Sequence, residues 1–282
     1  MTQLLARLPL GVLHALGWLL GWAIYGISPT YRRHVRENLA AAGYGDARVR
    51  RAAIAEAGKM VLETPRVWLR PRAETLALLR GIDGLAHYEA ARAAGKAIMV
   101  LTPHIGCFEI VAQALAERHP MTVLYRPSKQ EWLQPVIDRG RAQPGVSLAS
   151  ADLAGVRLLL AALKRRETVG ILPDQVPGVG EGEWVEFFGR PAYTMTLAAK
   201  LAGRADVVCL LVAGERLPRG AGYILRIRPL PPALPGESGA RHVNRAIESM
   251  VRLLPAQYLW GYNRYKRPAG APPPPAASPP AA

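Results

Sequence analysis

A histidine and a glutamate stand five residues apart in the segment IMVLTPHIGCFEIVAQAL, residues 98–115. A carboxylate that accepts one imidazole N–H makes the other ring nitrogen a better base, able to take a proton from a hydroxyl. On one regular helix the two side chains would lie about 140° apart. We therefore expect His104 in a loop that leaves a strand, Gly106 at a bend, and Glu109 in the first turn of a helix, where the helix dipole favours its charge and it can accept the imidazole N–H.

This spacing alone is unspecific, and a capped helix beside a satisfied histidine is the alternative interpretation. Two further strand ends favour a site. Arg126 lies in LYRP, and Asp174 and Gln175 lie in LPDQ, each directly after an apolar run. Taken singly, Arg126 could be a surface charge and Asp174 a turn former. Because ligands bind at the carboxyl ends of parallel strands, the set predicts one polar crevice.

A parallel sheet is needed to bring these side chains together, and the pattern after Gly95 predicts one. Short β-branched runs alternate with helical patterns, which indicates an α/β fold with a mostly parallel central sheet flanked by helices. Residues 31–94 read as helical, with breaks at 43–45 and 71. Strands are predicted at 97–102, 122–126, 168–172, 207–213 and 223–228, the last two as an antiparallel hairpin. Helices are predicted at 108–117, 131–141, 153–166, 194–201 and 243–253.

The N-terminal segment predicts contact with a membrane. Residues 8–27 carry no formal charge and, as a helix, are just long enough to cross a hydrocarbon core or to lie on it. Arg32, Arg33 and Arg36 follow, whereas only Arg7 precedes, so the rest of the chain is expected in the cytoplasm. We predict a membrane anchor at 1–30, an α/β domain with a helical N-terminal part at 31–267, and a disordered Pro/Ala-rich tail at 268–282 that adds nothing to the core.

The charge of the chain narrows the class of partner. The formal net charge of +15 favours an anionic partner such as nucleic acid, an anionic membrane, a phosphorylated substrate or an acidic protein. Cys107 and Cys209 show no disulfide or zinc spacing and are expected to be free thiols. The sequence shows neither a metal-ligand cluster nor a P-loop, so we expect no metal and no cofactor.

Taken in order, the motifs TPHIGCFE, LYRP, LPDQ, EFFGRPAYT and QYLWGYNRYKRP resemble those of the bacterial lipid A biosynthesis (late) acyltransferases, within the lysophospholipid acyltransferase superfamily. The similarity extends from the N-terminal segment to Pro268. It implies a cytoplasm-facing enzyme of the inner membrane with a single N-terminal anchor. It also implies transfer of a fatty acyl group from acyl carrier protein to a hydroxyl of a lipid A precursor.

The resemblance also implies roles for single residues. His104 is the expected general base, with Glu109 as its partner. The family mechanism needs no acyl-enzyme, so Cys107 is not expected to be a nucleophile. The residues expected to bind substrate are Ile105, Gly106, Cys107, Arg126, Asp174 and Gln175.

Two alternatives remain open at this level. The same reaction could serve a lysophospholipid, an ornithine lipid or another glycolipid. The chain could instead be a non-catalytic basic protein that binds a membrane surface or nucleic acid. We expect no nucleic-acid partner, because no RRM, KH or helix-turn-helix signature is present.

Overall fold

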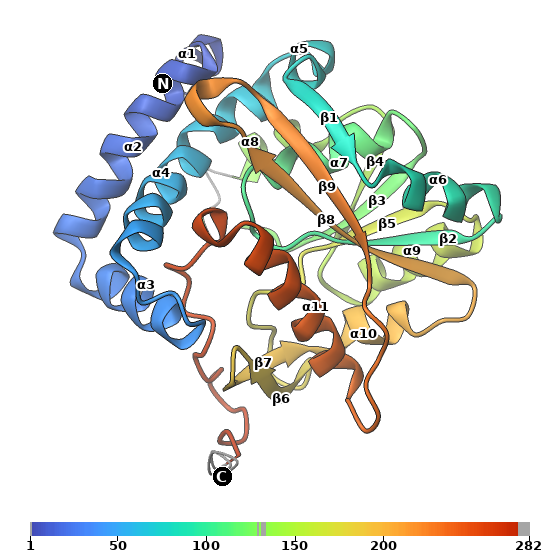
Figure 1. Ribbon diagram of the computed structural model, residues 1–282. Helices are drawn as coiled ribbons and strands as arrows, with labels where there is room; N and C mark the ends of the chain where they lie inside the picture. The colour runs from blue at the N-terminus through green and yellow to red at the C-terminus, as the bar shows by residue number, and fades with distance from the viewer. Residues whose placement is uncertain (1, 129, 131–133, 276–282) are drawn as a thin grey trace.

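The computed structural model describes residues 2–128, 130 and 134–275, with a seven-stranded sheet at its centre (Figure 1). The strand order is β1-β9-β8-β2-β5-β3-β4, and β8, β2, β5, β3 and β4 run parallel. β9 is antiparallel to β8, as predicted for that hairpin, and β1 is parallel to β9. These strands are β1 Leu79–Asp83, β2 Ala97–Leu101, β3 Met121–Tyr125, β4 Val146–Ser150, β5 Thr168–Ile171, β8 Val207–Arg216 and β9 Tyr223–Pro229. The predicted fold class, mostly parallel α/β, is confirmed.

Helices cover both faces of this sheet because its central strands are apolar on both sides. All five residues of β2 are buried: Ile98 and Val100 face a core built with α6 and α7, whereas Met99 and Leu101 face one built with α9, α10 and α11. The helices are α1 Thr2–Arg7, α2 Leu10–Ile27, α3 Pro29–Ala41, α4 Ala47–Leu69, α5 Arg72–Leu76, α6 Leu85–Ala93, α7 Glu109–Ala116, α8 Gln134–Arg141, α9 Leu153–Lys164, α10 Thr196–Ala202 and α11 Gly239–Leu253.

The predicted elements agree with the structure where the sheet is buried and fail at its edges. β1 lies inside the region predicted to be helical, and β4 was not predicted. Both are edge strands with partly exposed residues, so neither carries a continuous apolar run. The predicted helix at 194–201 begins at Thr196 instead, because the two preceding residues finish a strand. Part of the predicted helix at 131–141, residues 131–133, lies outside the described residues.

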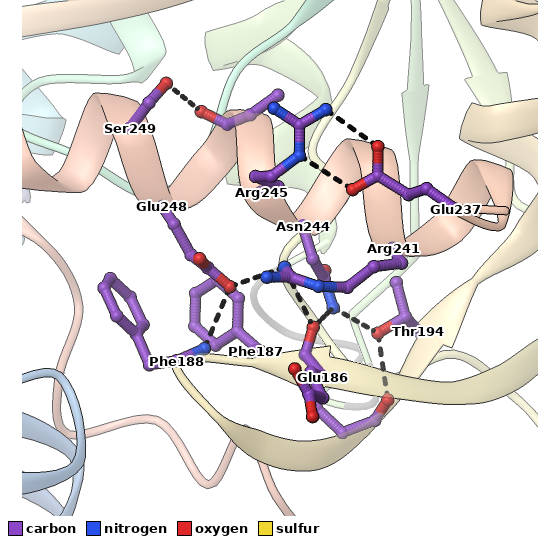
Figure 2. A network of polar contacts seen from close by, with 12 residues as sticks. Glu186, Phe187, Phe188, Thr194, Glu237, Arg241, Asn244, Arg245, Glu248 and Ser249 are labelled. Carbon is purple, nitrogen blue, oxygen red and sulfur yellow. Dashed lines mark hydrogen bonds and ion pairs between the residues drawn. The ribbon is translucent and has the colours of Figure 1, made fainter. Parts of the chain in front are cut away.

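A second, two-stranded sheet that was also not predicted packs against α11. It consists of β6 Gly182–Phe187 and β7 Arg190–Met195. Figure 2 shows how polar groups of α11 hold this hairpin. Asn244 donates to the Glu186 carbonyl (2.8 Å) and to the Thr194 hydroxyl (3.0 Å), and Glu248 accepts from the Phe188 N–H (2.9 Å). Buried polar groups are therefore paired, which fixes the hairpin in one register.

The Pro/Ala-rich tail does contribute to the core at one point. Ala271 is buried beside Val176 and Tyr193, and the Trp184 indole donates to the Pro272 carbonyl (2.9 Å). The prediction that the tail adds nothing to the core is therefore wrong for this stretch. Residues 276–282, the rest of the predicted disordered tail, lie outside the described residues.

Candidate active site

His104 and Asp174 meet at the carboxyl edge of the central sheet. β2 and β5 are parallel neighbours with Leu101 paired to Ile171, so residues three positions beyond each strand come together. The Nδ1–H of His104 donates to one Asp174 oxygen (2.8 Å), and the His104 backbone N–H donates to the other (2.9 Å). This two-point contact fixes both the backbone and the ring of His104.

The charge of Asp174 determines which ring nitrogen can act as a base. Burial by itself would raise the pKa of this carboxyl, but the charge and the hydrogen bonds of His104 lower it below its ordinary value. A carboxylate can only accept, so Nδ1 of His104 carries a hydrogen, and in the neutral form of the ring the lone pair is then on Nε2. The Gln175 side-chain nitrogen lies 3.2 Å from that Nε2. A substrate hydroxyl that replaced this amide could be deprotonated there.

The predicted pairing of His104 with Glu109 is wrong. Glu109 does lie in the first turn of α7, but its carboxylate accepts from the Trp68 indole (3.0 Å) and pairs with the Arg141 guanidinium. The intervening turn explains this orientation. Gly106 has φ +58°, and a side chain there would collide with the Gly214 carbonyl, so only glycine allows this approach.

Three of the four residues between His104 and Glu109, namely Ile105, Gly106 and Cys107, hold this turn. The Gly106 N–H donates to the Gln257 carbonyl (2.9 Å), and the Cys107 N–H donates to the Gly214 carbonyl (2.8 Å). Ile105 and Cys107 are buried in the cores, and neither they nor Gly106 are among the described residues that line the cavity beside His104. Their predicted contact with substrate is not supported by these positions.

The environment of Cys107 also makes it a poor nucleophile. Burial and the negative charge of Glu63 raise the pKa of this thiol well above its ordinary value. The thiolate is the nucleophilic form of cysteine, and it is suppressed here.

A cavity of about 260 Å³ opens beside His104. Arg126 and Gln175, two of the predicted residues, line this cavity and are exposed, so its mouth is polar. The predicted residue Glu109 also lines the cavity, but its side chain is largely buried. The Arg126 guanidinium is more than half exposed and lies 3.7 Å from Glu181. Deeper in, the walls come from α7, β3, β4 and β5 and are mostly apolar: Val111, Ala112, Met121, Val123, Val146 and Leu148. Such a shape suits a ligand with a hydrocarbon chain and a polar reacting end.

Sequence reasoning missed two residues of the site and misassigned a third. Trp68 and Arg141 hold Glu109 from 41 and 32 residues away, with no local motif to mark them. Asp174 was expected to bind substrate, yet it is the hydrogen-bond partner of His104. Among the described residues, no group of three or more His, Cys, Asp or Glu side chains could hold a metal ion.

Comparison with known proteins places this geometry in context. A family model described as bacterial lipid A biosynthesis acyltransferase matches residues 1–267. The lipid A biosynthesis lauroyltransferase of Escherichia coli K12 is 28% identical over 224 residues, covering 76% of this chain and 71% of that protein. The lipid A biosynthesis palmitoleoyltransferase of the same strain is 27% identical over 220 residues, covering 76% and 70%. A lipid A biosynthesis acyltransferase of Haemophilus influenzae is 29% identical over 182 residues, covering 63% and 56%.

Proposed function

The chain belongs to the bacterial lipid A biosynthesis acyltransferase family, and on that premise we propose how its site works. The proposed reaction moves a fatty acyl group from the thioester of acyl carrier protein to a hydroxyl of a lipid A precursor at the inner membrane. His104 is the proposed general base. The observation that carries this proposal is the buried Asp174 carboxylate on Nδ1 of His104, with Nε2 facing the cavity mouth.

The proposed chemistry needs one base and one group that stabilises negative charge. A thioester is already activated, so His104 Nε2 removes the proton of the attacking hydroxyl and later returns it to the leaving thiol. Asp174 stabilises the imidazolium formed in between. The Gln175 amide and the Arg126 guanidinium line the same mouth and can donate to the developing oxyanion. Each of these assignments is part of the proposal.

We place the acyl chain in the apolar part of the cavity. The walls of this part are formed by apolar side chains, including Val111, Met121, Val123 and Val146. The reacting carbonyl would remain at the polar mouth beside His104. Gly170 of β5 also lines the cavity, and a side chain there would collide with the end of Met121. This pair therefore forms the proposed limit on chain length.

The proposed partners account for the positive charge of the chain. Lipid A precursors carry phosphates, acyl carrier protein is acidic, and Arg126 at the mouth can meet either. A different acceptor, such as a lysophospholipid, an ornithine lipid or another glycolipid, would use the same dyad. The other alternative, a non-catalytic basic membrane-surface or nucleic-acid-binding protein, is disfavoured by the family match over residues 1–267.

The test uses the full chain with acyl carrier protein thioesters and a panel of those acceptors. We expect His104→Ala to reduce transfer to a small residual rate, about 10³-fold or more below wild type, and to leave membrane association unchanged. His87→Ala, at an exposed position on α6, is the matched control and should retain activity. Mass spectrometry of lipid A from cells with and without the protein should show the gain of one acyl group. Turnover near wild type in His104→Ala would remove the proposed base, and transfer only to another acceptor would reassign the substrate.

A further inference from the structure

α2 has one face inside the protein and one outside. In the part of the chain that is described, it is the one helix long and apolar enough to cross a membrane. In Figure 1 it runs along the outer edge of the molecule beside α4. Its buried positions recur every three or four residues, as expected for a helix packed along one stripe: Leu10, Leu13, His14, Gly17, Gly21 and Tyr25.

Glycines bring α2 and α4 into close contact. A side chain at Gly17 would meet the Lys59 backbone at 2.5 Å, and side chains at Gly21 or Gly58 would collide with the opposite backbone. Just before α2, the last turn of α1 is also held to α4, because the Arg66 guanidinium donates to the Ala6 carbonyl (3.0 Å). Contact between the two helices therefore runs along most of α2.

A buried charged cluster fixes the same seam. His14 of α2 is 4% exposed, and its Nε2 lies 3.0 Å from the Glu63 carboxylate. Glu63 also accepts from Arg216 Nε (2.8 Å) and from the Tyr223 hydroxyl (3.0 Å). If α2 separated from α4, His14 would lose its contact with Glu63 and the buried ion pair of Glu63 would be exposed, which costs free energy. α2 is thus an integral part of the domain.

The outward face of α2 is apolar throughout. Its large exposed side chains are Val12, Leu16, Trp18, Leu19, Ile24 and Ile27. Between Leu10 and Ile27 the sequence has no Asp, Glu, Lys or Arg. A continuous apolar face of this kind on a protein surface marks a site of contact with a membrane or another protein.

Charge next to this face points to a membrane. Arg32, Arg33 and Arg36 follow on α3, where the Arg36 guanidinium donates to the Tyr25 hydroxyl (2.9 Å). An apolar helix face with tryptophan, next to several arginines, complements an anionic bilayer surface, where the apolar side chains enter the headgroup boundary.

The neighbouring helix argues against a full crossing. α4 carries charged side chains along its whole length, from Arg48, Arg50 and Arg51 to Lys59 and Arg66. If α2 stood across a bilayer in this packing, α4 would be drawn into the hydrocarbon core, where each charge is expensive.

We propose that α2 lies in the plane of one leaflet, with its outward face in the lipid, both of its ends on the cytoplasmic side, and the α3 arginines on anionic headgroups. This rests on the inner-membrane location in the proposed function. α4 links this face to the site, because Trp68 near its end donates to Glu109.

Cysteine labelling tests the in-plane position. Thr2→Cys and Thr30→Cys, which flank α2, are placed separately in a full chain that carries Cys107→Ala and Cys209→Ala. A membrane-impermeant maleimide is applied to inverted inner-membrane vesicles and to spheroplasts. The in-plane position predicts that both sites label in inverted vesicles and neither in spheroplasts. Labelling of Thr2→Cys only in spheroplasts would overturn it and leave the membrane location standing.

Vesicle binding tests the lipid-facing residues. The full chain is mixed with vesicles of phosphatidylethanolamine and phosphatidylglycerol. Leu19→Glu should weaken binding by about tenfold or more, and Arg33→Gln by about fivefold at low salt. Leu234→Glu, at a similarly exposed leucine in the loop after β9, and Arg157→Gln on α9 are the matched controls. Equal losses in the controls would overturn the assigned face. Absence of binding by the wild-type chain would overturn the membrane location itself.

Discussion

Replacing Asp174 by asparagine tests the catalytic geometry most directly. The substitution keeps the size of the side chain and removes its charge. The amide oxygen can still accept from the His104 backbone N–H, which is 2.9 Å from Asp174 in the native protein. The amide N–H₂ group then faces the ring and turns Nδ1 of His104 into an acceptor. The ring hydrogen moves to Nε2, and the nitrogen that should take a proton can no longer do so.

The size of the effect follows from the contact. His104 Nδ1 and Asp174 Oδ1 are 2.8 Å apart. With charge centres about 4 Å apart and an effective dielectric constant near 20, their attraction in the imidazolium state is about 4 kcal/mol. Each 1.36 kcal/mol changes a rate about tenfold, so kcat should fall by about 10³-fold with little change in KM.

A double-mutant cycle on acyl transfer separates the roles of the two acids. Asp174 acts through His104, so Asp174→Asn should cost little more in a His104→Ala background. Glu109→Gln is the comparison, because Glu109 contacts Trp68 and Arg141, and its loss should persist in that background. Thermal unfolding shows that each variant is folded. An Asp174→Asn enzyme within a few-fold of wild type, with Glu109→Gln non-additive with His104→Ala, would refute the reasoning.

Three further outcomes follow from the structure. Gly170→Val should shift the preferred donor to shorter acyl chains in a competition among acyl thioesters, and an unchanged chain-length profile would place the end of the acyl site elsewhere. Burial would raise the pKa of Glu63, but Arg216 and His14 lower it from 4.5 to about 2. The Glu63 carboxylate therefore stabilises the folded state fully above about pH 4.5. This contribution of about 3 kcal/mol is lost as the pH falls toward 2. Urea unfolding of Glu63→Gln should therefore depend less on pH in that window, and an unchanged slope would contradict this. Cys107→Ala should keep activity within about threefold and lose about 1 kcal/mol of stability, whereas an acyl adduct at this cysteine, seen by intact-mass measurement, would reverse the assignment.

Local patterns in the sequence were sufficient to predict the central strands of the sheet. The run AIMVL is apolar at every position, so it had to lie between two layers, and Pro103 ends it where His104 begins. The positions of Arg126 and Asp174 after their strands followed from the same signal. The ordered motifs also identified the family, because five short segments in one order are far more specific than any one of them.

The edges of the fold were not predictable in this way. β1 and β4 are partly exposed and form because a neighbouring strand offers unpaired backbone groups, which leaves little trace in their own residues. The β6–β7 hairpin depends on α11, whose Asn244 and Glu248 lie some 50 or more residues further along the chain.

The sequence alone determined that His104 sits at a strand end near acidic residues, since a strand and its break are local properties. Which acid meets the ring was decided only by tertiary structure. Parallel pairing of β2 with β5 brings Asp174 to the His104 ring, although the two are 70 residues apart in the sequence. The turn at Gly106 directs Glu109 toward Arg141 instead. The same holds for α2: its composition permits a span, and only its packing on a charged helix shows which face is free. Contacts between distant segments depend on how whole strands and helices pair and cross, and the spacing of residues along the sequence does not specify this.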